Sequence, residues 1–453
     1  MPFIPHTDRD ERVMLGALGV SSIDELFDEI PEGLRGGDLS AIGPGVGEAA
    51  LLRQIAERAA GDGAALSFIG AGAYQHHVPA AVWDLTSRGE FLTAYTPYQA
   101  EASQGTLQLI YEFQTMLTAL TEMEVANASV YDGASALAEA VLMAVRANRK
   151  VRTCRIAIPA TVHPAYRSTV RNIVGSQGIE LVDVAVSEAG VTRVESLPDD
   201  AFTALVIPQP TFFGALEDVH ALTDWAHARD ALVIGVCNPI ALAMLTPPGR
   251  WGETGADIVV GEGQPIGIPL AGGGPYLGLM CCRKSIVRQM PGRIVGRTVD
   301  LDGRRGFALT LQAREQHIRR ARATSNICTN QGLLVTAATI YMALLGPTGL
   351  RSVADACHRG LASLLEAAAL LPGVSARFQG PHFHEAVIEL PLSADEVVTA
   401  MAEHGVAGGL ALGRYDPALD RCLLVNVTEV HTAQDIARWA EVLRRVLGER
   451  GHG

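Results

Sequence analysis

Lysine is nearly absent from this sequence. Only Lys150 and Lys284 occur in 453 residues, so arginine carries almost all of the positive charge. Long apolar runs are absent too, since the longest, at 333–346, is shorter than the ~20 residues of a membrane helix. The charged start of the chain does not resemble a secretory signal. Seven cysteines without CxxC spacing predict buried, reduced thiols in a cytoplasmic protein and no metal site.

The composition predicts a large folded protein with an acidic surface. Hydrophobic residues make up 48% of the chain and charged residues 19%, which excludes a disordered chain. The net charge of −13 makes nucleic acid an unsuitable partner. We therefore expect a globular protein that binds neither nucleic acid nor membrane.

Three regions differ in pattern. Residues 1–62 carry helix signals only, as around Asp24–Ile30 and 47–61, and predict an N-terminal helical arm. Residues 63–330 alternate between strands and helices, which predicts an α/β domain with a mostly parallel sheet. Its expected strands are Arg155–Pro159, Glu180–Val184, Ala204–Pro208, Ala231–Val236, Asp257–Val260 and Leu277–Cys282, and its expected helices are 106–122, 134–148, 163–176 and 217–228.

Residues 331–453 predict a smaller α+β domain. Helical periodicity covers 332–345, 352–371, 395–404 and 432–447, and short strand patterns lie at 374–379, 385–390 and 422–428. This mixture follows the alternating region without any low-complexity linker.

Two polar segments could carry chemistry. Asn127, Ser129, Asp132 and Gly133 precede a helix, where free N–H groups could cradle a phosphate or carboxylate. An ordinary capped loop is the alternative. Residues 95–105 hold Tyr95, Tyr98, Gln99, Glu101 and Gln104 between Pro and Gly, which suits either a functional loop or a tyrosine-anchored surface loop.

Three further positions have two interpretations each. His163 follows the strand Arg155–Pro159, where open α/β sheets bind ligands, although a lone histidine is more often structural. His76 and His77 have no carboxylate or cysteine near them in sequence that would complete a metal site. Gly272, Gly273 and Gly274 could bind phosphate through backbone amides or form only a turn.

An arginine-rich stretch at 314–322 runs into the polar segment 324–329. A solvated helix face is the usual explanation for such a charge run, and a subunit interface is the alternative.

Several of these strings together resemble one family. They are YTPYQAEASQG at 95–105, NASVYDGASALAEA at 127–140, PATVHP at 159–164, EGQPIGIPLAGGGPYLG at 262–278 and REQHIRRARATSNICTNQ at 314–331. The chain resembles the α chain (subunit 1) of the two-subunit glycine dehydrogenase (decarboxylating), the P-protein of the glycine cleavage system. The resemblance covers nearly the whole sequence.

The resemblance implies a pyridoxal-phosphate (PLP) enzyme fold of the aminotransferase-like fold type I. In that class a lysine near 257–279 forms the Schiff base and an acid faces the pyridine nitrogen, but this chain has no lysine there and has Asn238 in place of the acid. The chain is thus expected to have no catalytic residue of its own and a degenerate pocket. That pocket comprises Asn127, Ser129, Asp132, Gly133, His163 and Asn238.

The partners follow from the same resemblance. A β subunit should hold PLP covalently. The complex of the two subunits should decarboxylate glycine and pass the aminomethyl group of glycine to the lipoyl arm of the H-protein. The family implies an α2β2 assembly. Tyr95, Tyr98, Gln99, Glu101 and Gln104 are expected to face the partner's site, and Gly272–Gly274 its phosphate.

Two other functions remain open at this point. The chain could be a scaffold or regulatory pseudoenzyme that stabilises a PLP-binding partner without giving any side chain to catalysis. It could also be a self-sufficient PLP enzyme that uses Lys284, although Lys284 follows a strand instead of preceding the glycine loop.

Overall fold

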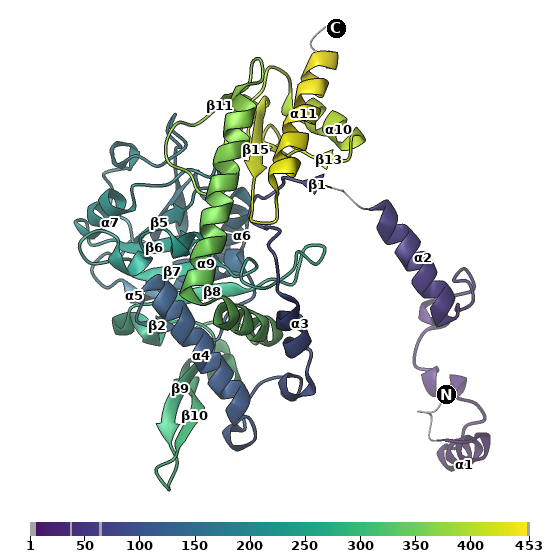
Figure 1. Cartoon of the computed structure of the whole chain (residues 1–453). Helices are drawn as coiled ribbons and strands as arrows, with labels where there is room; N and C mark the ends of the chain where they lie inside the picture. Colours follow the sequence, from purple (N-terminus) through teal and green to yellow (C-terminus); the bar gives the residue numbers. More distant parts are fainter. Residues whose placement is uncertain (1–5, 37–38, 63–65, 451–453) are drawn as a thin grey trace. The chain divides into compact units, whose positions relative to one another are not determined.

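The structure is a computed structural model that describes residues 6–36, 39–62 and 66–450. The chain divides into two compact units, Met1–Gly63 and Ala64–Gly453. The sequence boundary predicted at residue 63 lies outside the described residues, and the further division at residue 330 stays a prediction. Figure 1 shows the helices and strands of both units.

The N-terminal unit is helical. Its helices are α1 (Asp8–Leu18) and α2 (Glu48–Gly61). Thr7 and Asp10 form a capping box at the start of α1, and Gly19 ends the helix with a φ of +74°. The expected helix at Asp24–Ile30 is only a 3-10 turn at Asp24–Phe27.

The larger unit is built on a seven-stranded sheet of order β2-β8-β7-β6-β5-β3-β4. The strands are β2 (Val125–Ala126), β3 (Arg155–Pro159), β4 (Glu180–Val184), β5 (Ala204–Gln209), β6 (Leu232–Cys237), β7 (Ile258–Glu262) and β8 (Gly278–Cys282). The five strands from β7 to the edge strand β4 run parallel, as predicted from their apolar character. Strand β8 pairs antiparallel with both β7 and β2.

Helices cover both faces of this sheet. They are α3 (Ala80–Thr86), α4 (Gln104–Thr121), α5 (Gly133–Ala147), α6 (Pro164–Val174) and α7 (Val219–His227). Alternate residues of a strand face opposite layers: Ile156 packs with α5 and α6, whereas Ala157 packs with α4 and α7. All four helices predicted between 106 and 228 are present, with ends shifted by a few residues.

A hairpin that the sequence pattern missed follows the sheet. Strands β9 (Ile294–Val299) and β10 (Arg305–Thr310) pair antiparallel beside α4 (Figure 1). The short helix α8 (Gln316–Arg319) comes next, in place of the long helix face expected from the arginine-rich run. These strands are half exposed and rich in Arg and Gly, so their apolar pattern is weak.

The C-terminal part combines a four-stranded sheet with three helices. The helices are α9 (Gly332–Ala369), α10 (Ala394–Glu403) and α11 (Ala433–Arg450), and the strands are β11 (Ser375–Ala376), β12 (Glu385–Glu389), β14 (Leu410–Ala411) and β15 (Cys422–Asn426). Strand β1 (Leu66–Ser67) pairs separately with β13 (Val406–Ala407). The α+β composition agrees with the sequence pattern.

Helix α9 contains the two helices expected at 332–345 and 352–371. Its backbone is non-helical at Gly346, just before Pro347, so the helix is kinked there. By length and composition α9 could cross a membrane, but half of its most apolar window is buried inside the molecule. Val335 and Tyr341 are fully buried in the core, as in the core helix of a globular protein.

Candidate functional site

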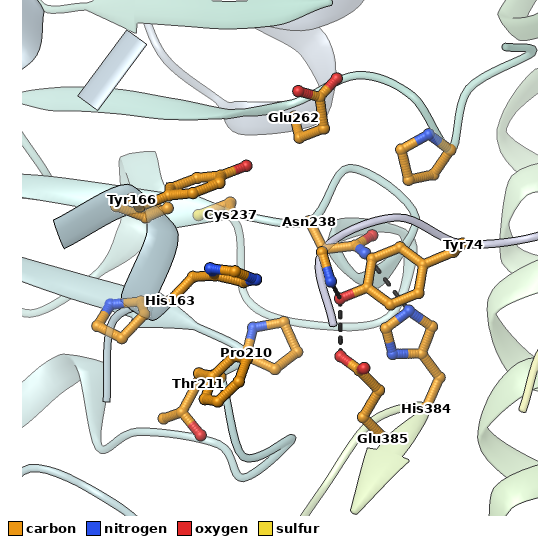
Figure 2. Close-up of a pocket in the computed structure, with 15 residues that line it drawn as sticks. Tyr74, His163, Tyr166, Pro210, Thr211, Cys237, Asn238, Glu262, His384 and Glu385 are labelled. Carbon is orange, nitrogen blue, oxygen red and sulfur yellow. Dashed lines mark hydrogen bonds between the residues drawn. The ribbon is translucent and has the colours of Figure 1, made fainter. Parts of the chain in front are cut away.

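A small pocket lies at the carboxyl ends of β5 and β6, where open parallel sheets bind ligands. The cavity measures about 80 Å³. Figure 2 shows its polar side chains, which come from segments far apart in the sequence. The lining includes Tyr74, His163, Tyr166, Thr211, Phe212, Cys237, Asn238, Glu262, His384 and Glu385.

His163 lines this pocket with both ring nitrogens already engaged. Its Nδ1 accepts a hydrogen bond of 3.0 Å from the backbone N–H of Ala165 and so caps α6. Its Nε2 lies 2.7 Å from the carbonyl oxygen of Ala71, to which it must donate. The ring is therefore neutral, and burial lowers its pKa. These bonds are those of a structural histidine, the alternative that the sequence left open.

Asn238 is the first residue after β6, and it closes a turn. Its Oδ1 accepts hydrogen bonds from the backbone N–H groups of Ile240 (2.9 Å) and Ala241 (3.2 Å). Its Nδ2 lies 3.5 Å from Nε2 of His384 (Figure 2). A neutral amide with these partners cannot keep a pyridine nitrogen protonated.

Tyr74 and Glu385 form a pair in the pocket that sequence analysis missed. The Tyr74 hydroxyl donates to Oε2 of Glu385 at 2.7 Å, and the backbone N–H of Ala71 donates to Oε1 at 2.6 Å. Burial raises the pKa of Glu385 to about 7. No local signal could reveal this pair, because 311 positions separate its members.

A second site assembles around Arg293, a residue that sequence analysis also missed. The Arg293 side chain is 6% exposed. Its Nη1 donates to Oδ1 of Asn330 at 3.0 Å and its Nη2 to the carbonyl oxygen of Cys328 at 2.7 Å. Its guanidinium lies over the ring of Tyr98, 5.7 Å from the centroid. Glu315 is its nearest carboxylate, with Oε2 3.8 Å from Nε.

This Arg293 site brings three of the singled-out segments together. Tyr98 comes from the segment 95–105, and Asn330 lies near the end of the 314–331 string. Asn330 also contacts the third segment, 127–140: its Nδ2 donates to the carbonyl oxygen of Ala128 at 2.8 Å and lies 3.4 Å from the hydroxyl of Ser129. The ring of His317 lies 5.0 Å from that of Tyr98. The three segments are thus parts of one surface.

The predicted residues of the 95–105 loop differ in their surroundings. Tyr95 is 84% exposed, and Gln99 and Glu101 are also exposed. Gln104, at the start of α4, instead bonds to the backbone of Phe307 in the hairpin through both Nε2 (2.8 Å) and Oε1 (2.9 Å). Gln104 therefore anchors the loop, while Tyr95 has a free ring.

The residues predicted for the degenerate pocket fall into two groups. His163 and Asn238 line the pocket. Asn127 and Ser129 are buried beside the Arg293 site instead, with Asn127 Nδ2 bonded to the carbonyl oxygen of Pro291 at 3.1 Å. Asp132 caps α5: its Oδ1 accepts a hydrogen bond from the backbone N–H of Ser135 at 2.7 Å.

The Gly272–Gly274 loop projects from the fold. Gly272 and Gly273 are exposed, and a Cβ on either would meet no atom within 4 Å. All three residues have positive φ, at 64°, 112° and 127°, so glycine is required by the backbone and not by crowding. This geometry leaves room for a partner to approach the loop.

Comparisons with known proteins agree over the full length. The family model for the glycine cleavage system P-protein matches residues 1–443. The chain belongs to this family. Two relatives named "Probable glycine dehydrogenase (decarboxylating) subunit 1" are similar: that of Thioalkalivibrio sulfidiphilus is 61% identical over 99% of this chain and 100% of its own, and that of Nitrosomonas europaea 58% over 99% of both.

Solved structures give the same result for the fold. The P-protein chain in a crystal structure of glycine decarboxylase in inhibitor-bound form superposes with a TM-score of 0.89 at 40% identity, over 99% of this chain and 100% of that one. The Lactobacillus brevis glutamate decarboxylase superposes at 0.68 with 13% identity, over 95% and 98%, and shows the fold alone. The predicted fold type I architecture is confirmed.

The pocket of this P-protein chain does not fit PLP. Neither lysine lines it: Lys150 is exposed and paired with Asp230 at 2.5 Å, and Lys284 is exposed after β8. Asn238 supplies no negative charge opposite a pyridine nitrogen. Two carboxylates of the lining, the partly buried Glu262 and the buried Glu385, also make the pocket unsuitable for a phosphate group.

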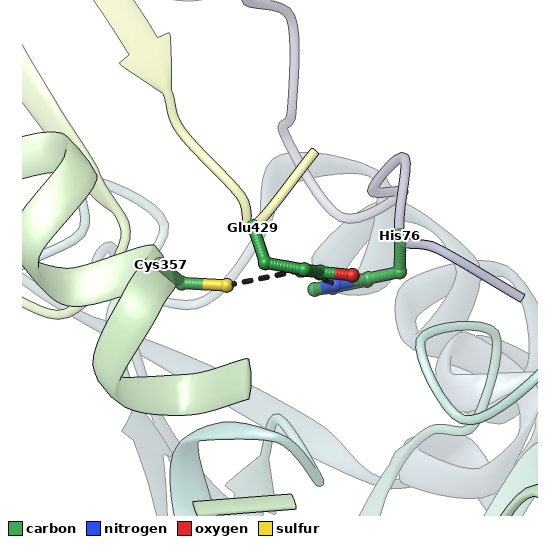
Figure 3. Close-up of side chains that lie close together, drawn as sticks. All are labelled: His76, Cys357 and Glu429. Carbon is green, nitrogen blue, oxygen red and sulfur yellow. Dashed lines mark hydrogen bonds and ion pairs between the residues drawn. The ribbon is translucent and has the colours of Figure 1, made fainter. Parts of the chain in front are cut away.

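His76, Cys357 and Glu429 form a cluster of side chains that the sequence did not indicate. Nδ1 of His76 lies 2.7 Å from Oε2 of Glu429, and the Cys357 thiol donates to the same oxygen at 3.3 Å (Figure 3). The carboxylate and cysteine that seemed absent in sequence are therefore neighbours in space. Two ligands of a tetrahedral zinc ion lie about 3.3 Å apart. The 2.7 Å distance between His76 Nδ1 and Glu429 Oε2 is shorter than that and is typical of a direct hydrogen bond.

Proposed function

We propose that this chain is the subunit of a glycine decarboxylase that lacks the cofactor lysine and completes the active site of a lysine-bearing partner. The observation that carries this proposal is the pairing of a pocket unfit for PLP with an ordered polar surface around Arg293. The chain would bind PLP nowhere, and the partner β subunit would hold it covalently. The cofactor supplies the electron sink for decarboxylation when bound there.

The Arg293 surface suits such a role because it is both preorganised and accessible. Arg293 contacts Tyr98 and Asn330 from a buried position, while Tyr98 is half exposed and Tyr95 of the same loop is 84% exposed. A site built from supported side chains holds a substrate more precisely than a mobile loop does. In this proposal Tyr95 and Tyr98 orient glycine or the lipoyl arm of the H-protein and exclude water.

The remaining parts of the proposal concern assembly and location. The subunit designation of the relatives supports a partner subunit for this chain. An α2β2 complex that exchanges the aminomethyl group with a lipoylated H-protein, in the cytoplasm, is the arrangement we propose.

The test uses the chain and its partner, first separately and then mixed. Each sample is incubated with PLP, reduced with borohydride and digested, and pyridoxyl-lysine is located by mass spectrometry. We expect the label on the partner alone and glycine decarboxylation only in the mixture. Stoichiometric label on Lys150 or Lys284 would contradict the proposal and favour a self-sufficient enzyme.

A scaffold or regulatory subunit is the second candidate, and the unfit pocket is the observation that favours it. The two candidates differ in what the Arg293 surface does. If substitutions there left turnover of the assembled complex unchanged, the scaffold would be the better description.

A further inference from the structure

The N-terminus of helix α5 already holds an anion that belongs to the chain itself. Helix α5 begins at Gly133, and the backbone N–H of Gly133 donates a hydrogen bond of 3.0 Å to Oε2 of Glu262. This N-terminus is the phosphate or carboxylate cradle that the sequence suggested. The carboxylate that occupies it comes from the last residue of β7.

The Glu262 carboxylate is held on both of its oxygens. While Oε2 faces Gly133, Oε1 accepts hydrogen bonds from the backbone N–H groups of Gln264 (2.9 Å) and Leu277 (2.8 Å). Three backbone donors converging on one group are typical of an anion-binding nest. The donors belong to three separate segments, the α5 terminus, the turn after β7 and the start of β8, so the carboxylate ties them together.

The space between Glu262 and the N-terminus of α5 is also filled by neighbouring atoms. A Cβ added at Gly133 would lie 3.0 Å from the backbone nitrogen of Glu262 and would overlap the hydroxyl of Tyr166. A phosphate group could reach the Gly133 N–H only by displacing the Glu262 side chain, since two anions cannot share these donors.

Burial of this carboxylate is costly in itself. Burial raises the pKa of Glu262 to about 7, although the three N–H groups act in the opposite direction. An apolar side chain would avoid this cost but would leave three buried donors unsatisfied. An acidic residue is therefore the side chain that can both close the cradle and satisfy its donors.

We propose that Glu262 is a built-in substitute for the phosphate of a cofactor, which closes the pocket of this chain to phosphate monoesters. The proposal deepens the proposed function, because it explains why the cofactor would reside only in the partner. It identifies Glu262 as a positioning residue that holds α5, β7 and β8 in the arrangement a bound phosphate would otherwise stabilise.

The test measures phosphate binding by the full-length chain without its partner. Glu262→Ala opens the cradle, and inorganic phosphate should bind to it at least about tenfold more tightly than to the wild type, a difference of ~1.4 kcal/mol. Phosphate should also raise the Tm of Glu262→Ala in a saturable manner, because a ligand specific for the folded state stabilises it. Titration calorimetry and thermal melts give the two readouts.

Two matched variants show whether phosphate binding depends on the charge of Glu262 or on the space that it occupies, and whether phosphate acts only as a general salt. Glu262→Gln removes the charge and keeps the volume, but its Nε2 cannot accept from a backbone N–H, so it should gain much less phosphate binding than Glu262→Ala. Glu217→Ala removes another buried carboxylate, which accepts from the N–H of Thr192 at 2.8 Å and not from the α5 terminus. Its melt should respond to phosphate no more than the wild type does.

Each result decides the matter. Saturable phosphate binding by the wild type would overturn the proposal without any variant, and so would a folded Glu262→Ala chain that gains no binding. If Glu262→Ala is too unstable to titrate, a phosphate-dependent rise in its Tm of the same size as that of Glu217→Ala would overturn it too. These readouts need no turnover, so a failure of the two-subunit proposal would be seen separately, in the borohydride experiment.

Discussion

Nη1 of Arg293 donates a hydrogen bond of 3.0 Å to Oδ1 of Asn330, and this bond joins the β9 end of the hairpin segment to the last polar residues before α9. Asn330 in turn donates a hydrogen bond from its Nδ2 to the carbonyl oxygen of Ala128. Arg293 thereby fixes the surface that we propose to face the partner's cofactor, and it does so from a buried position.

Replacing this arginine should affect both stability and turnover. Arg293→Met removes one of the positive charges near the Glu315 carboxylate, which keeps His317 Nδ1 at 3.6 Å, so we expect a cost of about 1–3 kcal/mol. Glycine decarboxylation by the assembled complex should fall by about tenfold to hundredfold, because Tyr98 and Asn330 lose their support. Thermal melts and decarboxylation assays measure the two effects.

The double variant Arg293→Met/Glu315→Gln distinguishes the two effects. It should recover much of the stability, since no charge is left unpaired, yet turnover should stay low. Full recovery of turnover along with stability would show that Arg293 has only a structural role.

Phenylalanine at either tyrosine of the 95–105 loop should lower turnover without dissociating the complex. Tyr95 is 84% exposed, so loss of its hydroxyl should leave the stability of the chain unchanged. Tyr98→Phe keeps the ring over Arg293 and loses only a 3.4 Å contact between its hydroxyl and Nη2. We expect a decrease of a few-fold to about tenfold for each in decarboxylation assays.

Tyr415→Phe is the control, because Tyr415 is about as exposed (44%) as Tyr98 (49%) and its ring packs against Phe212. Its turnover should equal that of the wild type. Unchanged turnover in both Tyr95→Phe and Tyr98→Phe would contradict an active-site role for the loop.

The contribution of Glu385 to the stability of the chain should decrease as the pH rises from 5 to 8. Burial raises the pKa of Glu385 from 4.5 to about 7, so the folded state binds its proton more tightly than the unfolded state. That contribution is fully present below pH 4.5 and is lost as the pH rises through 7. It amounts to about 3 kcal/mol for one such carboxyl.

Glu385→Gln should flatten this pH dependence, since an amide does not titrate. The exposed Glu396→Gln variant on α10 serves as the control and should follow the wild-type curve. Chemical denaturation at a series of pH values gives the comparison. An equal slope for Glu385→Gln and wild type would contradict the assignment.

The cysteines should fall into two reactivity classes. All seven are free thiols, of which Cys154 and Cys328 are exposed and the other five are buried. Burial raises the pKa of Cys281 to about 12 and that of Cys357 further, so neither forms the reactive thiolate in the native chain. The prediction of buried, reduced thiols was thus right for five cysteines and wrong for two.

A brief pulse of iodoacetamide followed by mass spectrometry checks this division. We expect label on Cys154 and Cys328 in the native chain and on all seven cysteines in urea. Native labelling of Cys357 at the rate of Cys154 would show that the His76–Glu429 pair activates the thiol instead of only accepting a hydrogen bond from it.

Much of the fold could be predicted because its signals are local. Strands β3 and β4 match their predicted bounds, since continuous apolar runs between polar turns define a buried parallel strand. The β9–β10 hairpin was missed because its side chains are half exposed and its apolar pattern is weak. The two helices predicted at 332–345 and 352–371 are both present, and the non-helical backbone at Gly346 separates them within α9.

The site was less predictable, because its bonds connect distant segments. His163 and Asn238 were found through their place after a strand, a local feature. Glu262 lay inside a string that had been singled out, but its role depends on Gly133, 129 positions away. Arg293 lay in no string at all.

The sequence by itself determined what this chain lacks and where the buried parallel strands and most of the helices lie. The absence of lysine from 257–279 and the amide at Asn238 are chemical facts that no folding can change. Only the tertiary structure decided which side chain occupies the N-terminus of α5 in this pocket. Backbone donors of Gly133, Gln264 and Leu277 must be satisfied once they are buried, and the packing of α5 against β7 brings Glu262 to them.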